Sequence, residues 1–220
     1  DTAILDTGER LSADLFVDCS GFKSLLMQKV LNVDVVSYSD QLFNDSALAV
    51  PTAISDIIPS ETVSTAMKHG WAWKIPLTNR FGNGYVYSSS YCSDEDAEIE
   101  LRTKLGILDS DVETRLIKMS IGRLTKHWHK NCLAVGLSQG FIEPLEATAL
   151  FLIQQTAAIF VEDFENGNYT NSNQEKFNCE INGYFDGIKD YIVTHYRTNS
   201  RRDTDYWKDC SAKSAPISDS

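Results

Sequence analysis

The spacing of apolar residues separates a region of short strands from a region of long helices. Over the first 135 positions, apolar residues alternate with polar ones or form short blocks, which is typical of β-strands. From residue 150 to a polar break at 165–168 they recur every three or four positions, the period of a helix. A second helical stretch is predicted over about 174–196. The chain is therefore expected to have an α/β fold, a mixed sheet with β-hairpins followed by a mostly helical region.

Turn and cap residues set the expected limits of these elements. Residues 79–84 are turn material between the alternating segment 71–75 and a strand at 85–87, which predicts a β-hairpin with an aromatic face. Ser93 opens a capping-box-like helix start, and Gly106 ends that helix. We also predict an N-terminal hairpin over residues 3–9, a strand buried on both faces over 14–21 and a helix over 22–31. Three further strands are predicted over 46–54, 115–121 and 132–135.

Charge and cysteine usage exclude several classes of function. The formal net charge is −11, whereas a nucleic-acid or anionic-membrane surface needs clustered Lys and Arg. The five cysteines are odd in number and lack a Cys-x-x-Cys pair, so neither a zinc site nor a disulfide framework is indicated. His127 and His129 are expected in a polar turn, with no metal bound. No apolar run approaches the roughly 18 residues of a membrane span. A cytoplasmic protein is expected.

The segment 140–155, which reads GFIEPLEATALFLIQQ, has two interpretations. It places Glu143 and Glu146 three positions apart, just before the first long helix. In the first, both carboxylates serve the helix start, because negative charge complements the exposed amides there and Pro144 suits a first turn. In the second, free amides beside a carboxylate form an anion site with an acid or base next to it. The residues alone leave both interpretations open.

Four segments together resemble the flavin-dependent halogenases, the family of tryptophan halogenases. Residues 14–22 (DLFVDCSGF) are similar to the strand and turn that the family places against the flavin nucleotide. Residues 70–76 (GWAWKIP) match its WxWxIP signature. Residues 132–150 resemble its flavin and halide loop, and residues 195–207 its C-terminal helical region. The resemblance covers nearly the whole chain.

The resemblance implies an activity, a domain organisation and partners. The implied activity is halogenation of an aromatic, indole-like substrate with halide, oxygen and reduced FAD, which a separate flavin reductase supplies. Residues 1–150 would belong to a flavin-monooxygenase-type FAD-binding domain, residues 151–210 to a helical substrate-binding region and residues 211–220 to a flexible tail. A homodimer is a further expectation.

The resemblance also assigns site residues. Glu146 falls at the catalytic acid of the family, whose implied task is to accept the ring proton or polarise the halogenating species. Glu143 is expected to cap or solvate the helix start. The amides of Thr148 and Ala149 fall at the halide site, which requires the regular helix to begin near Glu146 or Ala147. The implied flavin contacts are Cys19, Ser20, Gly21, Gly136, Leu137, Ser138 and Leu150. Residues that would fence the flavin from substrate are Trp71, Trp73, Ile75 and Pro76, although composition alone makes the two tryptophans core aromatics.

The sequence also departs from the family pattern. Ala149 stands where tryptophan halogenases commonly have Gly, which narrows the space beside the halide. Neither the glycine-rich dinucleotide fingerprint nor the motif that carries the catalytic lysine is in these residues, and there is no initiator Met, so a fragment of a longer protein is expected. The alternatives are a flavin monooxygenase, which the tryptophan pair argues against, and a non-catalytic remnant that binds a partner.

Overall fold

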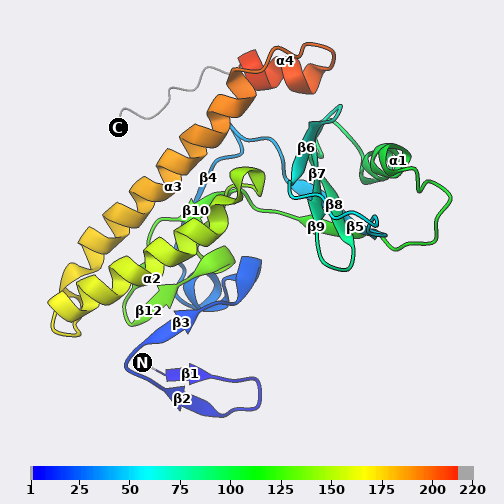
Figure 1. Ribbon diagram of the computed structural model, residues 1–220. Helices are drawn as coiled ribbons and strands as arrows, with labels where there is room; N and C mark the ends of the chain where they lie inside the picture. Colours follow the sequence, from blue (N-terminus) through cyan, green and yellow to red (C-terminus); the bar gives the residue numbers. More distant parts are fainter. Residues whose placement is uncertain (1, 213–220) are drawn as a thin grey trace. The chain divides into compact units, whose positions relative to one another are not determined.

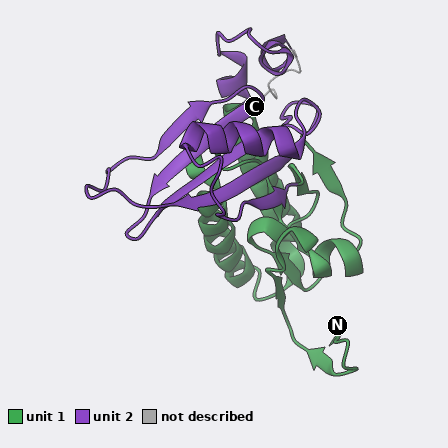
Figure 2. Ribbon diagram, turned by 90° about the vertical axis from the view of Figure 1, so that its right-hand side faces the viewer, with its two compact units in different colours: residues 1–38, 120–192, 217–220 green, residues 39–119, 193–216 purple. Residues whose placement is uncertain are grey.

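The structure is a computed structural model that describes residues 2–212 (Figure 1). The described chain forms two compact units, coloured separately in Figure 2. Unit 1 takes residues 2–38 and 120–192, and unit 2 takes residues 39–119 and 193–212. Each unit is therefore built from segments far apart in the sequence. The predicted domain boundary at residue 150 concerns the longer protein and stays a prediction.

Unit 1 contains three small sheets. The predicted N-terminal hairpin is present as the antiparallel pair β1–β2. In the second sheet β12 pairs in parallel with β3 and antiparallel with β11, and in the third β10 lies between β13 and β4. The strands are β1 (Thr2–Ile4), β2 (Arg10–Ser12), β3 (Phe16–Asp18), β4 (Val35–Ser37), β10 (Gly122–Leu124), β11 (Trp128–His129), β12 (Cys132–Ala134) and β13 (Gly140–Phe141).

Two long helices of unit 1, α2 (Thr148–Asn166) and the first part of α3 (Gln174–Arg197), lie side by side (Figure 1). The ring centroids of Phe160 and Phe177 are 5.8 Å apart across this contact. Trp128 is fully buried against both rings, so an aromatic cluster holds the helices to the β11–β12 hairpin. The short helices are η1 (Gly21–Lys23), the π-helix η2 (Leu25–Val30), η3 (Gly136–Ser138), η4 (Leu145–Ala147) and η5 (Asn171–Asn173).

Unit 2 is built on a five-stranded antiparallel sheet in the order β6-β7-β8-β5-β9. Helix α1 (Asp94–Leu105) packs on one face of this sheet. As predicted, Ser93 caps its start, where the Ser93 hydroxyl accepts a hydrogen bond from the Asp96 amide, and Gly106 caps its end. The core between them contains Leu48, Val50, Met67, Ala72, Tyr85, Tyr87, Cys92, Ala97 and Leu101. The remaining elements are β5 (Ser46–Thr52), β6 (Val63–Ala66), β7 (Gly70–Pro76), β8 (Phe81–Tyr87), β9 (Arg115–Lys118) and α4 (Asp205–Ala212).

Four element predictions need correction. Gly82 and Gly84 are not turn residues but lie in β8, because the chain already turns at 77–80, where the Leu77 amide donates to the Arg80 carbonyl. The predicted helix at 22–31 is broken at Ser24, whose φ is 44°, into the 3-10 helix η1 and the π-helix η2. Strand β3 is not buried on both faces, since Val17 is 50% exposed. The strand predicted over 115–121 ends at 118, and residues 122–124 pair in another sheet.

One helix of the described residues bears on the expected absence of a membrane span. The helical stretch Leu145–Asn166 is long and apolar enough to cross a membrane by length and composition. It nevertheless carries two buried polar residues, Thr156 and Asp163, whose side chains bond to Gln139 and Lys176 within unit 1. These bonds fit a helix of a folded domain. Of the predicted tail, Ser211 and Ala212 belong to α4, and residues 213–220 lie outside the described residues.

Candidate active site

Two consecutive residues in the left-handed conformation precede α2. Glu146 has φ 63° and ψ 8°, and Ala147 has φ 53° and ψ 32°. Neither is a glycine, and the left-handed region costs roughly 1–2 kcal/mol for such a residue. Strain of this kind persists only where the surrounding structure enforces it, and it clusters at functional sites. Its local effect is to interrupt the helical path at 146–147, so that the regular helix starts afresh at Thr148.

This start leaves amides available to an anion. With Ala147 as the N-cap, Thr148, Ala149 and Leu150 are the first helical residues, whose N–H groups have no carbonyl partner within the helix. The halide hypothesis required a helix start near Glu146 or Ala147, and the structure meets that geometric condition. The aligned peptide dipoles of α2 also favour negative charge at this end. Leu150 is 70% exposed, whereas the two residues before it are half-buried.

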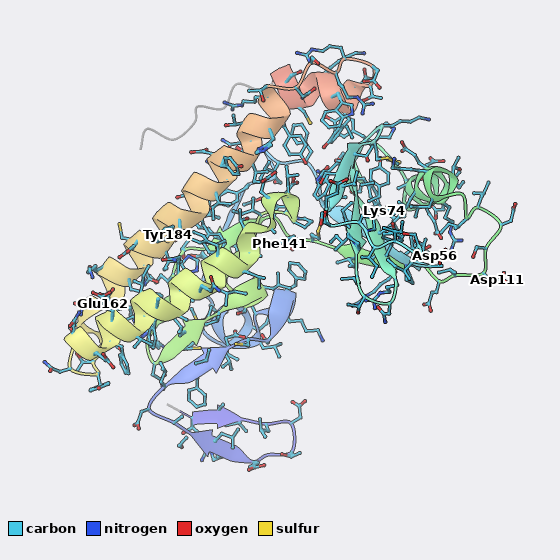
Figure 3. The ribbon with its side chains drawn as sticks, in the orientation of Figure 1. Asp56, Lys74, Asp111, Phe141, Glu162 and Tyr184 are labelled. Carbon is cyan, nitrogen blue, oxygen red and sulfur yellow. The ribbon has the colours of Figure 1, made fainter. Side chains whose placement is uncertain are left out.

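A cavity of about 120 Å³ adjoins the start of α2. Thr148, Ala149 and Glu143 line it together with Gly136 and Leu137 of the glycine loop. A water molecule takes roughly 30 Å³ of liquid volume, so a monatomic anion fits this space. The rest of the wall comes from Gln139, Gly140, Phe141, Ile142, Leu152, Ile153 and Phe185, of which Phe141 is labelled in Figure 3. The cavity therefore combines a mostly apolar wall with a helix start, as a desolvated anion site requires.

The two glutamates of this segment have opposite surroundings. Glu146 is exposed at the strained turn, whereas Glu143 is 1% exposed. The expectation that Glu143 caps or solvates the helix start is wrong, because the residue that caps α2 is Ala147. Ile142 and Glu143 are both buried, and the chain is exposed again at Pro144. Only Glu146 is an accessible carboxylate next to the free amides.

The two segments expected to contact a flavin meet in unit 1. Helices η1 and η3 touch, and the Ser24 hydroxyl donates to the Ser138 carbonyl at 2.9 Å. Gly21 and Gly136 have φ of 70° and 74°, and the place where a Cβ of Gly21 would stand has open space around it. Both turns suit close approach of a planar or phosphate-bearing ligand to the backbone. Cys19 and Leu137 are exposed, and Ser20 is half-buried.

A buried carboxylate, Asp18, organises this pair of turns. It is 1% exposed and accepts hydrogen bonds from the amide and hydroxyl of Ser20 and from the amides of Leu26 and Met27, at 2.5–3.0 Å. The Ser138 hydroxyl donates to the Asp18 carbonyl and Ser138 is 1% exposed, so this residue is engaged within the fold. Sequence reasoning missed Asp18. The available signal was an acidic residue at the end of an apolar strand, directly before helical amides that need an acceptor.

Behind the cavity, Phe185 stacks on His127, with ring centroids 5.0 Å apart and planes at 9°. His127 is buried, not in a polar turn, and its Nε2 lies 3.1 Å from the Asn182 amide oxygen. Burial, with a smaller contribution from the nearby Arg123 charge, lowers the pKa of His127 to about 3. Arg123 in turn forms a two-point ion pair with Asp186, at 3.1 and 2.9 Å. The neutral His127 ring therefore packs behind Phe185, and Asn182 links it to the Arg123–Asp186 ion pair.

The tryptophan pair belongs to unit 2. Trp71 and Trp73 project from the face of the sheet opposite α1, since Ala72 between them is in the α1 core. Their ring centroids are 6.1 Å apart. Trp71 is 7% exposed, which agrees with a core role, whereas Trp73 is half-buried and Ile75 and Pro76 are partly accessible. A role in fencing the flavin therefore stays a prediction, carried better by Trp73 than by Trp71.

Among residues 2–212, no group of three or more His, Cys, Asp and Glu side chains is arranged to hold a metal ion.

In unit 1 a parallel strand pair, whose glycine turns meet, adjoins the start of α2, an arrangement of an α/β fold that could receive a cofactor and an anion. The family model described as tryptophan halogenase matches residues 2–220, and the chain belongs to that family. The predicted family and fold class are thereby confirmed.

Individual relatives agree with this assignment. Tryptophan 6-halogenase SttH of Streptomyces toxytricini is 42% identical over 209 residues, which are 94% of this chain and 40% of that protein. Tryptophan 7-halogenase RebH of Lentzea aerocolonigenes is 37% identical over 206 residues, 92% of this chain and 39% of that protein. The crystal structure of SttH matches with a TM-score of 0.90 at 39% identity, over 98% of this chain and 45% of that one.

A further solved structure is BrvH, a flavin-dependent halogenase from Brevundimonas sp. BAL3. It matches with a TM-score of 0.89 at 38% identity, over 98% of this chain and 44% of that one. The chain spans about 40% of the length of the curated relatives it matches.

Proposed function

We propose that the complete protein is an FAD-dependent halogenase that replaces a ring hydrogen of an aromatic, indole-like substrate by a halogen. The observation that carries this proposal is the left-handed pair Glu146 and Ala147, which puts an exposed carboxylate directly before the free amides of Thr148 and Ala149. Membership of the tryptophan halogenase family supports the class of reaction, and relatives such as SttH and RebH, named for tryptophan, support the class of substrate.

Each residue then has a defined task. The amides of Thr148 and Ala149 hold the halide at the positive end of α2. When a halogen adds to an aromatic carbon as an electrophile, that carbon must lose its proton, and the Glu146 carboxylate accepts it. An exposed carboxylate on a rigid, strained turn has the accessibility and the fixed position that such a base needs.

The flavin would contact this chain through the turns of Cys19, Ser20 and Gly21 and of Gly136, Leu137 and Ser138, and through Leu150 in the first turn of α2. The positive φ of Gly21 and Gly136, the open space at Gly21 and the exposed Cys19 and Leu137 fit a cofactor that packs on backbone. Asp18 holds the first turn in shape. Reduced FAD together with oxygen would supply the oxidation of the halide. Trp73, with Ile75 and Pro76, would keep organic substrate away from the flavin.

The proposed partners follow from this chemistry. Reduced FAD would come from a separate flavin reductase as a diffusible molecule, which suits a cytoplasmic location. A homodimer is part of the proposal. The family is a soluble one, and the acidic net charge of −11 argues against nucleic acid or an anionic membrane as a partner.

The test compares Glu146→Gln with Glu162→Gln in the complete protein, supplied with a flavin reductase, halide and tryptophan. Glutamine keeps size and hydrogen bonding but cannot take a proton at neutral pH, so Glu146→Gln should lower turnover roughly 100-fold or more. Glu162 is exposed near the other end of α2 and labelled in Figure 3, so it controls for loss of a charge on the same helix. Its replacement should leave turnover unchanged.

Flavin affinity is measured separately for each variant, so that a binding defect is not mistaken for a chemical one. Equal, mild effects of both substitutions would contradict a catalytic role for Glu146. Absence of any halogenated product from the complete wild-type protein, across a screen of halides and aromatic substrates, would favour a non-catalytic remnant.

A further inference from the structure

Gly84 faces Trp73 across two neighbouring strands. In the register of β7 and β8, Trp73 pairs with Gly84, and on the other side of β8 the partner of Gly84 is Ala49 in β5. This row lies on the sheet face opposite α1. By contrast, the partner of Trp71 is Val86, which is fully buried. One indole therefore packs beside a valine and the other beside small residues.

The indole of Trp73 occupies the place where a side chain of residue 84 would begin. A Cβ built on Gly84 would stand 2.1 Å from Cζ2 and 2.2 Å from Cη2 of Trp73, and 2.5 Å from the Leu48 carbonyl oxygen. Contacts below 3.0 Å cannot be kept, so any other residue at 84 displaces the ring, the strand pairing or both.

Backbone freedom does not explain this glycine. Gly84 is absent from the glycines with positive φ, which include Gly21 and Gly136. It lies inside a seven-residue strand, where glycine costs stability and is typical of a close approach by another group. Gly82 lies two residues earlier on the same face of β8, and a Cβ there would meet only Leu77 and Ile75 at 3.8–4.0 Å, an ordinary contact.

We propose that Gly84 is a positioning residue, whose missing side chain lets the Trp73 indole rest against strand β8 and so fixes the aromatic wall of the halogenase. Its catalytic consequence rests on the proposed function, whereas the placement of the indole does not. A side chain at 84 lifts the ring off the sheet, which changes both its exposure and the space in front of the flavin. Trp71, buried beside Val86, keeps its position.

The test uses Gly84→Ala in the complete protein, with Gly82→Ala as the matched control and Trp73→Phe to remove the atoms in conflict. A phenyl ring is shorter than an indole and lacks Cζ2 and Cη2. Trp73 fluorescence is isolated as the difference between proteins with Trp and with Phe at 73, and its acrylamide quenching reports ring exposure. Halogenated product is measured per reduced flavin consumed at equal concentrations of folded protein, because reduced flavin that is not bound is oxidised by oxygen without forming product.

We expect Gly84→Ala to raise quenching of Trp73 and to lower product per flavin on the order of tenfold, the scale of a misplaced active-site wall. Gly82→Ala should change both by less than about twofold, and adding Trp73→Phe to Gly84→Ala should have no further cost, because the two substitutions act on one contact. If Gly84→Ala does not fold, folding of the Gly84→Ala, Trp73→Phe double variant supports the proposal.

Unchanged quenching in Gly84→Ala, or a double variant that is as unfolded as the single one, overturns the proposal, since the Leu48 carbonyl would then explain the glycine. Raised quenching with unchanged product per flavin keeps the positioning contact and overturns its catalytic consequence. A wild-type protein that makes no halogenated product contradicts the proposed function, and the quenching measurements still decide the contact between Gly84 and Trp73.

Discussion

Burial separates the two glutamates of the Glu-Pro-Leu-Glu segment, which look equivalent in the sequence. Glu143 lies 1% exposed at the wall of the cavity, and Glu146 is exposed at the strained turn. Removing a buried polar side chain leaves its partners unsatisfied, while an exposed one is replaced by water. The two residues therefore separate a role in stability from a role in chemistry.

The expected result is a stability effect at Glu143 alone. Glu143→Ala should lower the free energy of unfolding by about 1–3 kcal/mol, because buried groups lose their partners. Glu146→Gln should change it by less than about 0.5 kcal/mol, as for other surface substitutions. Urea denaturation of the complete protein measures both. Equal changes would contradict the difference in burial.

His127 predicts a pH dependence of stability. Its pKa is about 3 in the fold, against 6.5 for an ordinary histidine, so between these values the unfolded chain binds a proton that the folded protein does not. Stability is then complete above pH 6.5 and falls as the pH drops toward 3. At pH 5 the loss should be about 2 kcal/mol, from roughly 1.4 kcal/mol per pH unit. His127→Gln should abolish this contribution to the loss of stability. Urea denaturation of both proteins at pH 7 and pH 5 measures it, and an equal loss in the variant and the wild type would contradict the prediction.

At the scale of elements, the strained turn at 146–147 divides one apolar segment into two helices. The sequence pattern predicted a helix here but not its start, since Leu145, Ala147 and Ala149 are all ordinary helix residues and nothing in their order indicates positive φ. Tertiary structure imposes the break. Replacement of alanine by glycine should therefore have opposite effects on stability at Ala147, inside the strained turn, and at Ala149, in the helix after it.

Ala147→Gly should stabilise the protein by about 0.5–1 kcal/mol, because glycine adopts the left-handed conformation without strain. Ala149→Gly, in the first turn of α2, should destabilise it by up to about 1 kcal/mol through backbone entropy. Thermal unfolding of the two variants gives the comparison. A loss of stability in Ala147→Gly would show that this turn is not strained in solution.

Sequence pattern predicted the elements whose signals are local. The aromatic hairpin, the capped helix α1 and the helices α2 and α3 have alternation, caps or helical periods of their own. The errors at Gly82, Gly84 and Glu143 have a different origin, because glycine usually marks turns and glutamate usually faces water. What decides these positions is a partner distant in sequence, such as the indole that covers Gly84. Asp18 was missed for the same reason, since its partners become visible only when the turn is folded.

At the scale of the whole chain, each unit is discontinuous in sequence, and the candidate residues are divided between them. Glu146, the amides proposed to hold the halide and the two turns proposed to contact the flavin belong to unit 1, and the tryptophan pair belongs to unit 2. Hydrophobic periodicity identifies elements but carries no information on which distant segments share a core, so this division was not predictable from the pattern. The motifs that identify the family are local in the sequence, so they could be found without knowledge of this division into units.

Residues 1–220 by themselves should neither bind FAD tightly nor halogenate. They supply the turns proposed to contact a flavin, but no glycine-rich fingerprint to hold its pyrophosphate. Backbone amides at a helix start are the usual source of that affinity. Titration of FAD into this chain, shown to be folded by circular dichroism, should give no stoichiometric binding at micromolar concentration, whereas the complete protein should bind. Tight, stoichiometric flavin binding by the 220 residues alone would contradict this prediction and would place the principal nucleotide contacts in the turns at Gly21 and Gly136.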